Sequence, residues 1–159
     1  MKRWGIALAL VAVLGTGAAL GLLAWQRHLP DDTPASRTAP DLRRGAYLAA
    51  VGNCAGCHTA RGGALLAGGR PIPTPFGTVF SPNLTPDPTG LAGWSADDFW
   101  AALHLGRSRD GHLLVPAHPV SNTTLVTRED ADDLHAWLQS QTAVAAPNRA
   151  HELRWPYGT

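Results

Sequence analysis

Cys54-Ala55-Gly56-Cys57-His58 is the stretch that decides the fold of this chain. In this spacing two thiols can add to the vinyl groups of a porphyrin, and the adjacent imidazole can reach its iron. A thioredoxin-like redox pair shares the Cys-x-x-Cys, but it occurs in a βαβ context and needs no histidine. A zinc site needs four ligands, and the sequence has no second cysteine pair. The motif therefore predicts one covalently attached haem c, held by Cys54 and Cys57, with His58 as the first iron ligand.

Three segments around this motif carry helix signals. Each begins at a residue typical of helix N-caps, namely Asp41, Ser95 or Thr127. Between the first two segments, residues 60–93 are rich in glycine and proline and have no apolar period, which predicts a long loop organised by a buried prosthetic group. No convincing strand pattern occurs, so we expect an all-α domain with three main helices around one haem. The predicted helices cover residues 41–51, 95–106 and 127–141.

The N-terminal 25 residues have the pattern of a transmembrane anchor. Lys2 and Arg3 are followed by an uncharged, mainly apolar run from Trp4 to Trp25. About 20 apolar residues cross a hydrocarbon core of about 30 Å, and interfacial tryptophans are expected at its ends. A cleaved signal peptide is the alternative, but its apolar region is usually about 7 to 15 residues long. The pattern thus predicts a single-pass helix in the bacterial inner membrane with the haem domain in the periplasm.

The rest of the chain divides by composition. Residues 26–40 contain three prolines and no apolar period, which is typical of a linker. Residues 41–142 are the predicted haem domain, and residues 143–159 are predicted to form an irregular tail. The formal net charge of +1 and the lack of a basic cluster in the domain exclude a nucleic-acid partner.

A further set of short motifs lies between residues 41 and 140. They are Arg44-Gly45-Ala46-Tyr47-Leu48, Gly68-Gly69, Pro71-Ile72-Pro73-Thr74-Pro75-Phe76-Gly77, Ser81-Pro82-Asn83-Leu84-Thr85-Pro86-Asp87, Gly93-Trp94-Ser95 and Asp110-Gly111. Together with the haem motif, they resemble a haem domain of the cytochrome c subunits of membrane-bound bacterial alcohol, aldehyde and gluconate dehydrogenases. Those subunits usually contain three such domains, whereas this chain has room for one.

The resemblance implies the cytochrome c fold, in which the first and last helices of the domain cross. It places Gly45 at the close approach of these helices, with Tyr47 and Trp137 packed at the crossing. It also implies that loop residues line the haem and can hydrogen-bond its propionates or ligands. These loop residues are Asn83, Thr85 and Trp94, although simple packing is an equal alternative for the tryptophan.

The sixth iron ligand is where the sequence departs from the resembling domains. In those domains a methionine follows a Pro-Ala pair, but the only methionine of this chain is Met1, and His118 stands at that position. Imidazole is a competent iron ligand, so we predict bis-histidine ligation by His58 and His118. His112 is an alternative ligand, and an open or water-bound iron position is another. Because methionine ligation raises the haem potential, its replacement by histidine predicts a lower potential.

These features predict an electron-transfer protein rather than an enzyme. We expect it to carry single electrons, alone or as a subunit of a dehydrogenase or respiratory complex. The expected donor is a periplasmic or membrane-bound dehydrogenase or a quinol-linked protein, and the expected acceptor is another cytochrome or a terminal oxidase. The alternative is a haem enzyme or gas-binding sensor with an open or displaceable distal iron position.

Overall fold

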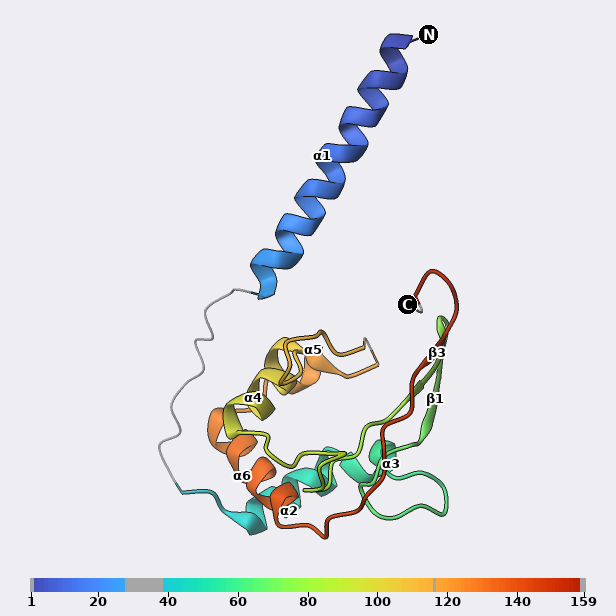
Figure 1. Ribbon diagram of the computed structural model, residues 1–159. Coiled ribbons are helices and arrows are strands. Elements are labelled where there is room, and N and C mark those ends of the chain that lie inside the picture. The colour runs from blue at the N-terminus through green and yellow to red at the C-terminus, as the bar shows by residue number, and fades with distance from the viewer. Residues whose placement is uncertain (1, 28–38, 116, 158–159) are drawn as a thin grey trace. The chain divides into compact units, whose positions relative to one another are not determined.

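The computed structural model describes residues 2–27, 39–115 and 117–157 (Figure 1). The chain divides into two compact units, Met1–Asp32 and Thr33–Thr159. The first unit contains helix α1 (Lys2–Arg27), and the second contains the haem motif. The predicted linker at 26–40 includes residues 28–38, which lie outside the described residues.

The predictions of a transmembrane helix at residues 1–25 and of a single-pass inner-membrane location are wrong on this structure. In the part of the chain that the structure describes, no helix combines the length and the apolar character that crossing a membrane requires.

The three predicted helices of the haem domain are confirmed, and so are their N-caps. The Asp41 carboxylate accepts hydrogen bonds from the first turn of α2, and Ser95 forms a reciprocal capping box with Asp98 at the start of α4. The Thr127 hydroxyl accepts from the Asp130 N–H at the start of α6. Two short helices, α3 and α5, complete the set in the described part of this unit. The bounds are α2 Leu42–Val51, α3 Cys54–His58, α4 Ala96–Leu105, α5 Val120–Thr123 and α6 Arg128–Gln139.

Helices α2 and α6 cross at a point where one residue has no side chain. A Cβ added at Gly45 would overlap the carbonyl oxygen of Asp133 and would lie 2.7 Å from the Cβ of Trp137. The Asp133 carboxylate also accepts a hydrogen bond of 2.7 Å from the Asp41 N–H. The close approach expected for Gly45 and Trp137 is therefore confirmed, whereas Tyr47 is 63% exposed and is not buried at the crossing.

The expectation of an all-α fold is wrong, because the domain also contains a small antiparallel sheet. Its order is β1-β2-β3, with β1 (Pro71–Thr74), β2 (Gly77–Phe80) and β3 (Glu152–Leu153). The edge strand β1 tolerates two prolines because an outward-facing backbone position needs no N–H donor. Strand β3 comes from the C-terminal tail and pairs Leu153 with Gly77. The tail is thus partly regular and tied to the domain.

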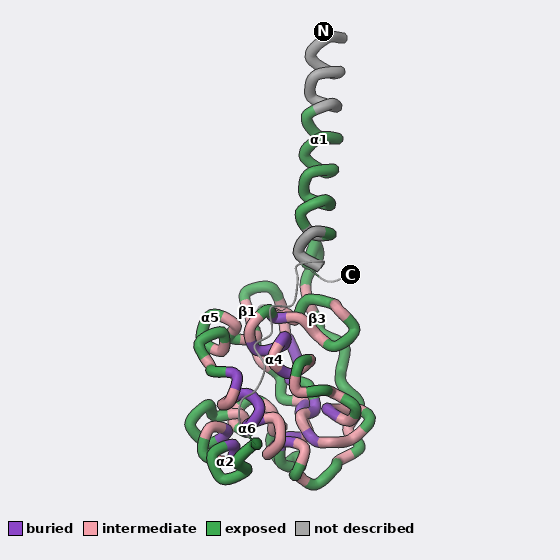
Figure 2. The backbone as a smooth tube through the Cα atoms, turned by 90° about the vertical axis from the view of Figure 1, so that its left-hand side faces the viewer, coloured by how far each residue is buried: buried purple, intermediate pink, exposed green. Residues whose placement is uncertain are grey.

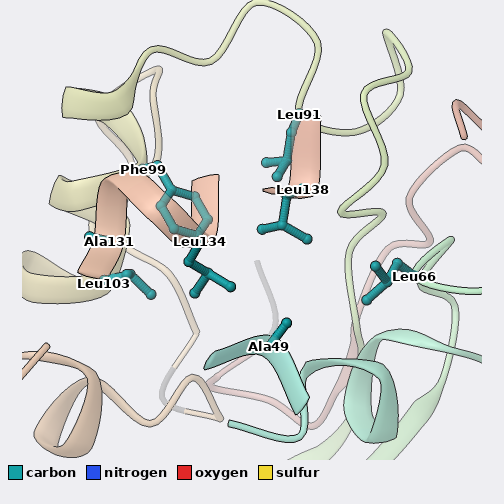
Figure 3. Close-up of a cluster of buried hydrophobic side chains, with 8 residues drawn as sticks. All are labelled: Ala49, Leu66, Leu91, Phe99, Leu103, Ala131, Leu134 and Leu138. Carbon is teal, nitrogen blue, oxygen red and sulfur yellow. The ribbon is translucent and has the colours of Figure 1, made fainter. Parts of the chain in front are cut away.

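The hydrophobic core is built mainly from α4, α6 and the loops that face them (Figures 2 and 3). Ala49 of α2 and Leu66, from the loop after α3, add to this core from the side of the haem motif. Half-buried side chains that pack against the core include Cys54 and Trp94. The core residues are Ala49, Leu66, Leu91, Phe99, Leu103, Ala131, Leu134 and Leu138.

Candidate functional site

The two cysteines lie on the short helix α3 and are both free thiols. Their i, i+3 spacing brings them to neighbouring positions on one helix face. Cys54 is half-buried against the core, and burial raises the pKa of its thiol, whereas Cys57 is exposed. One thiol therefore lies against the core and the other at the surface, at neighbouring positions on one helix face.

His58 ends the same helix and has a fixed ring orientation. Its Nδ1 lies 2.9 Å from the carbonyl oxygen of Pro82. Because a carbonyl oxygen only accepts, Nδ1 carries the proton and Nε2 keeps a free lone pair. The pKa of His58 is lowered, chiefly because burial disfavours the charged ring, and further by the nearby charge of His118, while the bond to Pro82 opposes this. The ring is therefore held in the neutral form that binds metals.

The loop that carries Pro82 packs directly on the segment after the haem motif. The Gly68 N–H donates to the carbonyl of His58 at 2.7 Å. Gly68 has a φ of +73°, and a Cβ there would lie 2.5 Å from the carbonyl carbon of Pro82. Only glycine allows this conformation and this approach together. The Gly68-Gly69 motif thereby holds the Pro82 carbonyl within reach of His58.

His118 lies in the loop between α4 and α5, and one of its ring nitrogens is unpaired. Its Nε2 is buried and has no hydrogen-bond partner. The pKa of His118 is lowered because burial disfavours the charged ring. His118 thus offers a buried ring nitrogen that no group of the described protein occupies, as a free metal ligand does.

Each of the other described histidines has a hydrogen-bond partner. His104 bonds to the carbonyls of Trp100 and Val126, at 3.2 and 2.8 Å. The alternative ligand His112 is exposed and pairs with Asp110. His135 contacts Gln139, and His151 accepts from the N–H of Phe80. Among the described residues, His118 Nε2 is the single buried side-chain nitrogen or oxygen without a partner.

These side chains fit the donor set of a covalently bound haem. Cys54 and Cys57 offer free thiols, and His58 offers a lone pair on Nε2. A buried, unpaired nitrogen costs about 1–3 kcal/mol, so the Nε2 of His118 calls for a partner. Haem iron is such a partner, because the nitrogen of a neutral imidazole is a competent iron ligand.

The loop residues Asn83 and Thr85 are buried and engaged with the protein itself. Asn83 Oδ1 accepts from the N–H and the hydroxyl of Thr85, both at 2.8 Å, and its Nδ2 donates to the carbonyl of Val144 at 2.8 Å and to the Thr89 hydroxyl at 3.0 Å. This hydrogen bonding to the tail was not apparent from the sequence, because the partners lie about 60 residues apart. A haem-binding role for Asn83 and Thr85 stays a prediction, as it does for Trp94, which is half-buried against the core.

We expect Asn83→Ala to destabilise the domain by about 2–3 kcal/mol. The substitution leaves the buried N–H of Thr85 without a partner and removes the shorter of the two hydrogen bonds that the Val144 carbonyl accepts. An unsatisfied buried group costs about 1–3 kcal/mol, and a lost hydrogen bond costs about 1 kcal/mol. Urea denaturation of the haem-bound chain measures the change. As a control, Asn122→Ala, at an exposed residue of α5, should change the stability by less than about 0.5 kcal/mol. An equal loss in both variants would contradict the prediction.

Known proteins match this chain over the described haem domain. The family model described as cytochrome c matches residues 42–142. A nicotinate dehydrogenase subunit from Pseudomonas putida is 44% identical over 149 residues, which is 89% of this chain and 13% of that protein. The cytochrome c subunit of gluconate 2-dehydrogenase from Pantoea cypripedii is 41% identical over 72% of this chain and 26% of that protein. A diheme cytochrome c-type protein of Cereibacter sphaeroides is 31% identical over 96% of this chain and 52% of that protein. The chain thus spans about half or less of these relatives.

Proposed function

The chain belongs to the cytochrome c family, and on that premise we propose that it transfers single electrons through one haem c attached to Cys54 and Cys57. We further propose that His58 and His118 are its two axial ligands. The observation that carries the ligation proposal is the buried, unpaired Nε2 of His118. When bound, the haem supplies a reversible ferric–ferrous couple, and the protein sets its potential through ligands, burial and hydrogen bonds.

The side chains of the site favour electron transfer over substrate turnover. His58 keeps a free lone pair on Nε2, and His118 has a buried, unpaired Nε2, which are the two nitrogens that ligation of a haem iron by two histidines requires. A second imidazole on the iron would also occupy the position at which a gas or peroxide binds. The exposed Cys57 places one attachment point at the surface, where a partner protein can approach the edge of the haem.

We propose a dehydrogenase as the electron donor. The support is that the relatives from Pantoea and Pseudomonas are named as subunits of dehydrogenases. This chain spans only a fraction of the length of these relatives. The dehydrogenase donor is therefore part of the proposal, and the substrate named for each relative is said of that relative alone.

The proposed function is tested by producing the full chain with haem c maturation and counting its haem. We expect one haem per chain, retained under denaturing conditions, and a titration that fits one electron. In Cys54→Ser/Cys57→Ser, the covalent haem should fall to background, since no other thiol exists. Two haems per chain, or rapid peroxide turnover by the purified ferric protein, would overturn the proposal.

A further inference from the structure

The C-terminal tail runs alongside the loop that carries Pro82. Figure 1 shows this segment passing from the end of α6 to β3. The Val144 N–H donates to the Thr85 hydroxyl at 3.1 Å, and the Ala146 N–H donates to the Thr89 hydroxyl at 3.0 Å. The tail lies beyond residues 42–142, which the cytochrome c family model matches. These contacts therefore join a loop inside the matched domain to a tail that follows it.

Asn148 makes the tail contact at the peptide that follows Pro82. Its Oδ1 accepts from the N–H of Asn83 at 2.8 Å, and its Nδ2 donates to the carbonyl of Thr89 at 3.2 Å. These two bonds fix which end of the amide faces which group, because a backbone N–H needs an oxygen and a carbonyl needs a donor. The side chain of Asn148 is thus oriented so that its Oδ1 faces the N–H of Asn83.

The same peptide group is hydrogen-bonded on both of its sides. The peptide that joins Pro82 to Asn83 offers its N–H to Asn148, and its carbonyl accepts from the Nδ1–H of His58. Hydrogen bonds in such a chain polarise one another, by perhaps 10–30% per bond. An acceptor on the N–H makes the carbonyl oxygen more negative, which strengthens its bond to the histidine.

We infer that Asn148 is a positioning residue that lowers the reduction potential by strengthening the hydrogen bond that Pro82 accepts from the iron ligand His58. This inference rests on the proposed haem attachment and ligation. A stronger acceptor at Nδ1 makes the imidazole a better electron donor, which stabilises ferric iron. The tail thereby tunes the potential of the site without touching the haem.

The test is the reduction potential of the haem-bound full chain with Asn148→Leu, a side chain of similar size that covers the Asn83 N–H but cannot accept from it. We expect the equilibrium to shift about threefold toward the ferrous form, which is about 28 mV at 59 mV per tenfold for one electron. Asn148→Asp keeps an acceptor and adds negative charge, so it should shift the equilibrium in the opposite direction. In the reduced protein, the Nδ1–H proton of His58 should exchange with solvent faster in the leucine variant.

The matched control is His151→Leu, which removes another tail contact, the bond from the Phe80 N–H, but leaves the Pro82–Asn83 peptide untouched. We expect its potential and its proton exchange to equal those of the wild type. Equal shifts in the two leucine variants, or no shift in Asn148→Leu, would overturn the inference while leaving the proposed function intact. A wild-type chain that takes up no covalent haem would instead overturn the proposed function.

Discussion

His118→Ala should convert the ferric haem from a low-spin to a high-spin state. Two imidazoles give a strong ligand field, and the substitution removes one of them, so the iron would keep His58 and an open or water-bound position. The absorption spectrum and the paramagnetic resonance spectrum of the purified ferric protein measure this change. Carbon monoxide should then bind the reduced variant without displacing a protein ligand.

Two further variants separate ligation by His118 from a general disturbance of its loop. His118→Met should restore a low-spin haem of higher potential, because a thioether favours ferrous iron relative to an imidazole. His112→Ala is the matched control, since His112 is exposed, pairs with Asp110 and lies on the same loop; its spectrum should equal that of the wild type. A high-spin wild-type protein, or one that binds carbon monoxide without ligand displacement, would contradict the assignment.

The helices of the domain could be predicted because their signals are local in sequence. Asp41, Ser95 and Thr127 each cap a helix through a backbone group two or three residues away. Such bonds depend on the chain immediately around the residue, and the sequence displays them directly. The haem motif is equally local, because one short helix contains both thiols and the histidine that is predicted to be the first ligand.

The strands and the role of the tail could not be predicted, because they depend on contacts between distant segments. Pro71 and Pro73 argue against a strand unless it lies at the edge of a sheet, and only the fold places them there. Strand β3 pairs with residues more than 70 positions earlier in the chain. The same separation hid the bonds from the tail to Asn83, which the family resemblance had assigned to the haem.

The apolar N-terminal run predicted a helix correctly, but it did not predict a membrane-spanning one correctly. The sequence predicted a membrane-spanning helix from its uncharged run, and the structure does form helix α1 over Lys2–Arg27. In the described residues, however, no helix meets the requirement for crossing a membrane. The apolar, uncharged run therefore predicted a helix correctly, whereas the prediction that this helix spans a membrane is wrong on this structure.

Gly45→Ala should destabilise the haem-bound domain by about 1–3 kcal/mol or more, as expected for overpacking at a tight contact. In an exposed helix the same substitution would stabilise by about 1 kcal/mol, because alanine loses less backbone entropy than glycine. At Gly45 the added Cβ would overlap the carbonyl oxygen of Asp133, a backbone atom that cannot move by changing rotamer. Helices α2 and α6 would have to separate, and the bond from Asp41 to Asp133 would lengthen with them. Guanidinium denaturation measures the loss.

The sign of the change in the free energy of unfolding distinguishes a tight helix contact at Gly45, where alanine destabilises, from an exposed helix position, where alanine stabilises. Ala50→Ser is the matched control, because it also adds one heavy atom to α2, at an exposed position. We expect this control to change the free energy of unfolding by less than about 0.5–0.7 kcal/mol, a value set by helix propensity and surface tolerance. The loss at Gly45 should also persist in a Trp137→Ala background, since the nearest obstacle is the Asp133 backbone rather than the indole. A stabilising Gly45→Ala would contradict the prediction, because it would mean that α2 and α6 do not approach as closely as the structure shows.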